Sequence, residues 1–142
     1  MKHSKSVSVQ VGTRTLKMET GTLACQAAGS VIITVGETMV FSGVTNTAKP
    51  REGIDFFPLQ VEYREKFYAA GKFPGGFFKR EARPSEREIL IARVTDRPIR
   101  PLFPNGYRND VQINNSLLSF DGENMPDAQS INAASAALHI SE

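Results

Sequence analysis

The chain has 142 residues, of which 40% are apolar and 23% charged, with a formal net charge of +2. This length and balance favour one folded domain and exclude a largely disordered chain. No apolar run approaches the ~18 residues of a membrane span, and no apolar stretch follows the N-terminus, so we expect no membrane segment, no signal peptide and a cytoplasmic location. The single cysteine, Cys25, excludes an internal disulfide framework and a multi-cysteine zinc site.

The charges are segregated along the chain. Residues 64–108 contain eleven basic and five acidic side chains and so carry a net charge of +6. The remaining residues contain six basic and ten acidic side chains and carry −4. A local excess of positive charge attracts polyanions such as nucleic acid. The alternative is a solvated surface with scattered counter-ions.

The first sixty residues have the pattern of β-structure. Apolar residues alternate over 7–11 and again at Leu16 and Met18, which predicts two half-buried strands joined by a hairpin. Residues 31–35 and 39–45 are rich in β-branched side chains and predict a second hairpin, with its turn at Gly36. A further strand is predicted over 57–63.

A helix is predicted after a loop that spans residues 64–84 and starts with a short helical turn at 65–70. Ser85 and Glu88 have the spacing of a capping box, in which each side chain bonds a backbone N–H near the helix start. Leu90 and Val94 are four residues apart and are expected to share a packed face, with Ile91 beside them.

Proline marks the expected end of the first helix and the expected start of the last helix. Pro98 is expected to end the helix near Asp96 or Arg97, because its ring and missing N–H oppose continuation. A strand is predicted over 111–120. Pro126 suits the first position of a last helix over 127–139, which is rich in alanine.

These elements predict an α+β fold, a layered mixed sheet with helices. The small apolar residues of the last helix have no later element in the chain to cover them. A helix needs tertiary packing to persist, so we expect the domain to be truncated and poorly stable alone.

The segment from Gly71 to Arg80 has the composition of a nucleic-acid contact. Phe77 and Phe78 follow a Pro-Gly-Gly turn, and Lys79 and Arg80 follow them directly. Aromatic rings stack on bases, and lysine and arginine bind phosphates, so these four residues are candidates for binding single-stranded RNA. The alternative is that the two rings fill the core beneath the loop. The glycine spacing matches neither a P-loop nor a dinucleotide-binding fingerprint.

A second cluster of cations lies at the predicted end of the first helix. Arg93 and Arg97 are four residues apart, and Arg100 follows after three more. Three guanidinium groups on one side are candidates for binding an anion such as phosphate. The alternative is that Asp96 and nearby acids pair with them and that they stabilise the helix end.

Three motifs of the basic segment are distinctive when taken together: the stretch from Tyr68 to Glu81, the run Arg83-Pro84-Ser85-Glu86, and residues 96–103. In combination they resemble the motifs of bacterial polynucleotide phosphorylases. Residues 16–21 and 132–138 resemble the first ribonuclease PH-like domain of that family.

The resemblance implies a function for the longer protein. The family degrades single-stranded RNA from the 3′ end with phosphate as nucleophile, releases nucleoside diphosphates, and also runs in reverse. Three chains form a ring with a central RNA channel, each with two ribonuclease PH-like domains followed by KH and OB-type domains. Residues 1–142 would be part of the first ribonuclease PH-like domain, and the other domains are absent from this chain.

The resemblance also implies roles for individual residues. Phe77, Phe78, Lys79 and Arg80 occupy the positions of a channel loop that holds RNA. Lys79 replaces an arginine, so the charge is kept and the bidentate fork is lost. The phosphate-binding residues and the Mg²⁺ ligands belong to the second ribonuclease PH-like domain, so no catalytic or metal-binding residue is expected here.

The resemblance also implies partners, and two alternative functions stay open beside it. The expected partners are single-stranded RNA, two further copies in a homotrimer and an RNA-degradation assembly, with no DNA and no membrane. One alternative is a non-catalytic RNA-binding ring subunit of exosome type. Another is a self-contained nucleotide-processing enzyme, which would need a nucleophile or metal cluster that Cys25 and the distant His3 and His139 do not supply.

Overall fold

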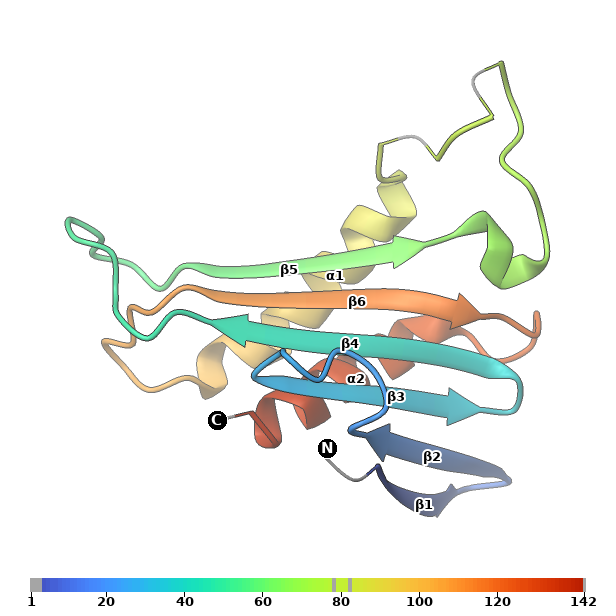
Figure 1. Cartoon of the computed structure of the whole chain (residues 1–142), viewed down its shortest axis with the longest axis horizontal. Helices are drawn as coiled ribbons and strands as arrows, with labels where there is room; N and C mark the ends of the chain where they lie inside the picture. Colours follow the sequence, from blue (N-terminus) through green and yellow to red (C-terminus); the bar gives the residue numbers. More distant parts are fainter. Residues whose placement is uncertain (1–3, 78, 82, 142) are drawn as a thin grey trace.

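The computed structural model describes residues 4–77, 79–81 and 83–141. In this part of the chain six strands form one mixed sheet in the order β1-β2-β3-β4-β6-β5 (Figure 1). The strands are β1 (Lys5–Val11), β2 (Arg14–Thr20), β3 (Gly29–Val35), β4 (Thr38–Asn46), β5 (Leu59–Glu65) and β6 (Val111–Ser119). The α-helices are α1 (Glu86–Ile99) and α2 (Pro126–His139), and two short 3₁₀ turns are η1 (Phe67–Ala70) and η2 (Arg100–Leu102). This arrangement confirms the α+β layered fold.

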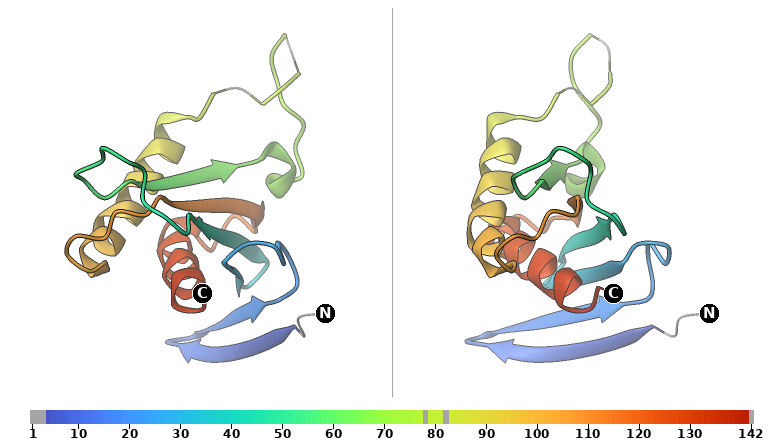
Figure 2. Two further views of the ribbon diagram at one scale, coloured as in Figure 1. Left: turned by 60° about the vertical axis from the view of Figure 1, so that its left-hand side comes forward. Right: turned by 90° about the vertical axis from the view of Figure 1, so that its left-hand side faces the viewer.

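Both α-helices lie on the same face of the sheet (Figure 2). β5 and β6 are parallel, so the chain must cross over between them, and α1 is part of that crossover. α2 packs on β3, β4 and β6, while α1 packs on β5. The core lies between the sheet and these helices, and its most buried members include Ile33, Val40 and Ile113. Neither α-helix of the described chain has the length and apolar character needed to cross a bilayer.

The N-terminal hairpin forms as predicted, but its first strand is not half-buried. Val7 lies opposite Met18, and Val9 lies opposite Leu16. Nevertheless Val7, Val9 and Val11 are 51–64% exposed. β1 is an edge strand, and α1 and α2 pack on the strands beyond it, so the described chain leaves this apolar face open. The prediction of half-burial was wrong because alternation identifies a strand face without identifying what covers it.

The start of α1 is confirmed in detail, whereas its buried face was wrongly predicted. The Glu88 N–H donates to Ser85 Oγ (3.2 Å), and the Ser85 N–H donates to Glu88 Oε2 (2.6 Å). Ile91 is 5% exposed, but Leu90 is 61% exposed and Val94 is exposed as well. Two adjacent stripes of this helix contain apolar residues, and only the packing against β5 decides which one is buried.

α1 also continues past the point where it was expected to stop. The helix includes Pro98 and ends at Ile99. Ile99 is buried in the core, and the Arg100 N–H donates to the Asp96 carbonyl, so the last turn is held on both sides of the proline. The prediction that the helix ends near Asp96 or Arg97 was therefore wrong. A proline in the last turn removes one hydrogen bond without preventing its neighbours from packing.

β5 begins two residues later than predicted. Phe57 precedes the strand and packs in an aromatic cluster, with ring centroids 4.5 Å from Phe103 and 5.4 Å from Tyr107. The Pro58 carbonyl accepts a hydrogen bond from the Val111 N–H (3.2 Å), at the start of the parallel ladder. Proline thus stands immediately before the strand, where its missing N–H costs nothing.

The last helix is covered, contrary to expectation. Ala133, Ala134 and Ala137 are fully buried, because α2 folds back onto β3, β4 and β6. The approach is so close that a Cβ at Gly29 would collide with the Ala137 carbonyl oxygen. Alanine is needed here because larger side chains would hold the helix away from the sheet. The expectation of an uncovered helix was therefore wrong, while the expectation of poor stability stays a prediction that has lost this argument.

Asp121 ties two turns of the sheet together. Its carboxylate accepts hydrogen bonds from the backbone N–H of Asn124 (2.8 Å), the Asn124 side-chain amide (2.6 Å), the Thr38 hydroxyl (2.9 Å) and the Glu37 N–H (3.1 Å). The bonds from Asn124, above all, hold the pKa of Asp121 well below its usual range, because each of them favours the ionised form. The β3–β4 turn is thereby joined to the loop between β6 and α2.

Candidate nucleic-acid interface

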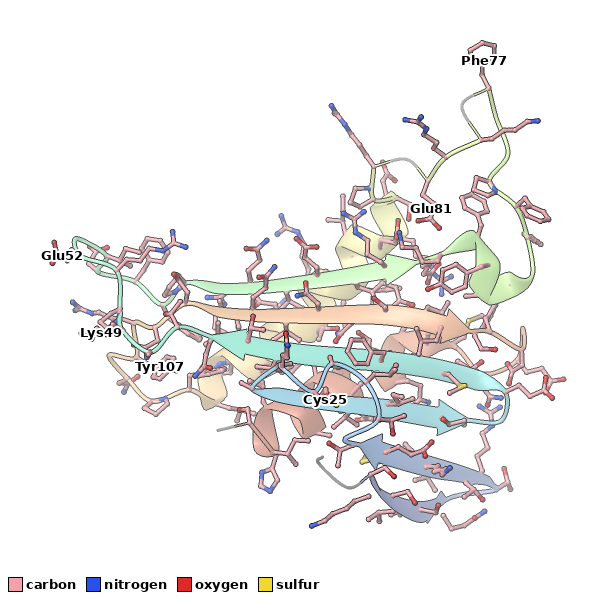
Figure 3. The ribbon with its side chains drawn as sticks, viewed as in Figure 1. Cys25, Lys49, Glu52, Phe77, Glu81 and Tyr107 are labelled. Atoms are coloured by element: carbon pink, nitrogen blue, oxygen red, sulfur yellow. The ribbon has the colours of Figure 1, made fainter. Side chains whose placement is uncertain are left out.

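The loop between η1 and α1 projects away from the sheet, with Phe77 at its outer end (Figure 3). Phe77 is 95% exposed and Phe73 is 94% exposed. Gly71 and Gly76 adopt φ values of 65° and 88°, which turn the chain in a way that side chains rarely allow. The alternative in which Phe77 fills the core is therefore wrong. Phe78, the other predicted ring, lies outside the described residues.

Lys79 and Arg80 stand next to Phe77 on the same exposed loop. Both residues are exposed, and the Lys79 N–H donates to the Gly76 carbonyl (3.4 Å). Among the described residues, no carboxylate forms an ion pair with either side chain. The structure thus places one exposed ring and two exposed cations on the same loop, and their predicted role in binding RNA stays a prediction.

The two ends of this loop are anchored at its foot. Glu81 accepts hydrogen bonds from the Lys66 ammonium and from the Phe67 N–H, and it lies below Phe77 toward the sheet (Figure 3). Glu88 also accepts a hydrogen bond from the Glu65 N–H (2.9 Å), which joins the start of α1 to the end of β5.

The environment of the Glu88 carboxylate, which holds the start of α1 to the end of β5, favours its charged form. Burial opposes ionisation of its carboxyl group, but hydrogen bonds from Ser85 and Glu65 outweigh it, with further attraction from Arg64. The net effect is a pKa below the usual value. The anchored foot leaves the outer part of the loop as the exposed portion.

The predicted arginine cluster divides into two parts. Arg93 and Arg97 are exposed and share one side of α1, since the helix continues through both. Arg100 instead forks onto Asp96, with Nη2–Oδ1 at 2.9 Å and Nε–Oδ2 at 3.1 Å. Two further N–H groups of its guanidinium donate to the carbonyls of Phe57 (3.2 Å) and Leu59 (3.0 Å).

These contacts give Arg100 a structural role, because it holds the end of α1 to the start of β5. Its pairing with Asp96 is the alternative considered for the whole cluster. An anion-binding role for Arg93, Arg97 and Arg100 stays a prediction, and Arg93 and Arg97 have the more available side chains.

The described residues do not fit a divalent metal ion. No three His, Cys, Asp or Glu side chains gather in this part of the chain in a way that could hold one. A Mg²⁺ ion needs at least one or two carboxylates together with substrate oxygens. We therefore assign no metal ligand to this segment.

Sequence reasoning overlooked two features of this region. Phe73 is as exposed as Phe77, and its place between Lys72 and a Pro-Gly-Gly turn was the available signal. Arg64, Lys72 and Arg83 line a cavity at the foot of the loop. They come from β5, the loop and the segment before α1, so no local pattern could have predicted that they meet.

The chain is similar to bacterial enzymes over almost its whole length. It is 59% identical to the polyribonucleotide nucleotidyltransferase of Thermomicrobium roseum over 135 residues, which are 95% of this chain and 17% of that protein. It is 58% identical to the polyribonucleotide nucleotidyltransferase of Desulfitobacterium hafniense, covering 94% of this chain and 18% of that protein. The chain thus spans about one fifth of the length of these curated relatives.

Solved structures share the fold at lower identity. A chain of the Archaeoglobus fulgidus exosome with RNA bound to the active site superposes with a TM-score of 0.68 at 24% identity, covering 89% of this chain and 51% of that one. An archaeal exosome core superposes with a TM-score of 0.56 at 22% identity. The model of the ribonuclease PH family, described as the 3′ exoribonuclease family, domain 1, matches residues 12–142. The mixed sheet with two helices on one face is therefore a ribonuclease PH fold, and the chain belongs to the 3′ exoribonuclease family, domain 1.

Proposed function

We propose that this chain is part of a 3′-to-5′ phosphorolytic exoribonuclease, which degrades single-stranded RNA to nucleoside diphosphates with inorganic phosphate. The observation that carries the proposal is the exposed ring of Phe77 beside Lys79 and Arg80 on a loop that projects from the sheet. Its support is the identity of 58–59% to polyribonucleotide nucleotidyltransferases. This segment supplies RNA contacts and part of the ring scaffold.

The loop binds RNA without reading its sequence. An exposed aromatic ring stacks on any base, at about 1–3 kcal/mol per base. The Lys79 ammonium and the Arg80 guanidinium bind phosphates, the first as a point charge and the second through two parallel hydrogen bonds. Phe78 is proposed as a second stacking ring on its position in the sequence alone. Arg93 and Arg97 are proposed to contact a further anion such as an RNA phosphate. Arg100, the third member of the predicted cluster, is left out of this contact because its guanidinium pairs with Asp96.

The remaining parts of the reaction belong to the longer enzyme. We assign no catalytic residue to this chain, since phosphoryl transfer needs positioned charge around the transferring group and the described residues do not fit a metal. Mg²⁺ and the phosphate site are proposed for the second ribonuclease PH-like domain. The whole protein is proposed to be a cytoplasmic homotrimer, within an RNA-degradation assembly.

The alternative, a non-catalytic ring subunit of exosome type, has weaker support. The exosome chains are similar in fold, at 22–24% identity, whereas the nucleotidyltransferases are similar in sequence over 94–95% of this chain. The enzyme is therefore the function that these observations favour.

The salt dependence of RNA binding tests the proposal. Replacing Lys79 and Arg80 together by alanine is expected to weaken binding of a fluorescent single-stranded RNA and to reduce the slope of log K against log salt by ~0.7 per lost phosphate contact. Fluorescence anisotropy at several salt concentrations measures both quantities. Phe77→Ala is expected to weaken binding with little change in slope and no loss of thermal stability, because stacking releases few counter-ions and the ring is exposed.

A matched control removes the same charges elsewhere. Lys5 and Arg14 are exposed on β1 and β2, at the sheet edge opposite β5. Their double alanine variant loses one lysine and one arginine and is expected to keep the original slope. Equal slopes in the loop variant and the unmodified protein would refute the proposed phosphate contacts.

A further inference from the structure

A cavity of about 420 Å³ lies at the foot of the loop, separate from Phe77 at its outer end. Its walls come from the end of β5, from η1, from both ends of the loop and from the first turn of α1. Binding sites for small molecules typically have volumes of ~300–1,000 Å³, so this cavity has room for one small ligand.

The carboxylates in its wall already have partners. Glu65 accepts a hydrogen bond from the Tyr63 hydroxyl (3.0 Å) and pairs with Arg87 (3.4 Å). Glu81 accepts bonds from Lys66 and Phe67, and Glu88 accepts bonds from two backbone N–H groups, as described above. These acids are used in holding the fold, so their charge is largely compensated within the wall.

The cations in the wall are less fully paired. Arg64, Lys72 and Arg83 line the cavity, and none of them forms an ion pair with a carboxylate of the described chain. Arg64 attracts Glu88 electrostatically without reaching ion-pair distance. Three cationic residues from three separate segments therefore line one cavity, which favours an anionic ligand with several acceptor oxygens.

The other walls are aromatic and apolar. Phe67 lines the cavity and is 43% exposed, and Leu117 and Phe120 close the side formed by the end of β6. A partly exposed ring beside three cations offers a stacking surface next to phosphate-binding groups. This combination suits a ligand that carries both a planar base and a phosphate.

We propose that this cavity binds one nucleotide, with its phosphate held by Arg64, Lys72 and Arg83 and its base against Phe67. The nucleotide has two sources, a free nucleoside diphosphate or one unit of an RNA strand that continues from the outer loop. The second source rests on the proposed RNA-binding function, whereas the first does not.

Two titrations of the purified protein test this site. One measures binding of a fluorescent ADP analogue, and the other measures binding of a labelled oligoadenylate, both by anisotropy. The double variant Arg64→Gln/Arg83→Gln is expected to weaken binding of at least one probe about tenfold or more, because two charge-assisted contacts are lost. Arg64→Lys/Arg83→Lys keeps the charges and is expected to restore part of the affinity. The matched control Lys5→Gln/Arg14→Gln is expected to change neither titration.

The results separate the two sources and the two proposals. Weaker binding of the ADP analogue alone identifies a free nucleotide, and weaker binding of the oligoadenylate alone identifies a unit of the strand. Unchanged binding of both probes, or no difference from the control variant, overturns the cavity proposal while leaving the outer loop untouched. If the Lys79/Arg80 variant keeps its RNA affinity while the cavity variant loses ADP affinity, the proposed function fails and the nucleotide site stands. Thermal unfolding checks the fold, and Arg83→Gln alone, at an exposed position, repeats the test should the double variant unfold.

Discussion

Two glycines with the same backbone conformation have different surroundings. Gly12 and Gly36 both adopt φ +61° in hairpin turns. A Cβ at Gly12 would meet nothing within 4 Å. A Cβ at Gly36 would lie 2.6 Å from Asn124 Nδ2 and 2.8 Å from Asp121 Oδ2, so the hydrogen bonds between these two residues would have to shift. The pair therefore separates backbone strain from loss of a tertiary contact.

We expect Gly12→Ala to lower the free energy of unfolding by about 1–2 kcal/mol, which is the ordinary cost of a left-handed conformation for alanine. Gly36→Ala is expected to cost clearly more, because it adds the displacement of Asn124 from Asp121. Urea denaturation of both variants measures the difference. Equal losses would show that the Asp121 contacts adjust to the added methyl group without cost.

At the level of the element, α1 shows that neighbouring apolar residues on one helix can differ in burial, and so in their contribution to stability. Ile91 is buried against the core side, with Thr95 and Ile99 on the same stripe. The Thr95 hydroxyl is satisfied by the Ile91 carbonyl (2.9 Å) and lies 3.2 Å from Ser130 Oγ on α2. This buried stripe joins α1 to both the sheet and α2, while Leu90 and Val94 face away from it.

Alanine substitutions at adjacent positions of α1 test this assignment. Ile91→Ala is expected to lower the free energy of unfolding by about 2–5 kcal/mol, because it leaves a cavity in the core. Leu90→Ala is expected to change it by no more than about 0.5 kcal/mol, since the side chain is exposed and alanine is a good helix former. Chemical denaturation under identical conditions provides the measurement. A larger loss at Leu90 than at Ile91 would contradict the observed orientation of the helix.

Across the whole molecule, burial of the strands decreases from the centre of the sheet toward β1. β3, β4 and β6 lie beneath α2, whereas every residue of β1 is exposed and pairs only with β2. Few buried contacts and exposed backbone hydrogen bonds are the features of a segment that opens locally.

Hydrogen exchange is expected to reveal this gradient. Amides of β1 that bond to β2 should exchange at least ~100-fold faster than those of Ile33, Val40 and Ile113, because the former open locally and the latter exchange only in larger openings. Mass spectrometry or NMR measures the rates residue by residue. Protection of β1 equal to that of β4 would mean that another molecule covers its exposed valines in solution.

Which cations of the basic segment, residues 64–108, are paired and which are available is also decided only in the whole molecule. Lys66, Arg87 and Arg100 pair with carboxylates that are 15, 40 and 4 residues away in sequence. Lys79 and Arg80 form no ion pair within the described residues. A count of charges predicted an excess of positive charge, but only the folded chain separates structural cations from available ones.

The local signals were sufficient for most elements and for the loop. The Ser85–Glu88 capping box, the turn at Gly36 and the position of Pro126 at the start of α2 were all predicted and are confirmed. Each depends on sterics and hydrogen bonds between residues a few positions apart. The motif from Tyr68 to Glu81 likewise indicated the family, which the matching family model confirms.

What the sequence by itself determined is therefore where most of the strands, the helix starts and the turns lie, and to which family the chain belongs. The tertiary structure decided which stripe of α1 is buried, that α2 covers the sheet, that Arg100 joins α1 to β5, and that Arg64, Lys72 and Arg83 meet at one cavity. The reason is physical: burial and ion pairing are set by groups that come together from distant parts of the chain, and their proximity exists only after folding.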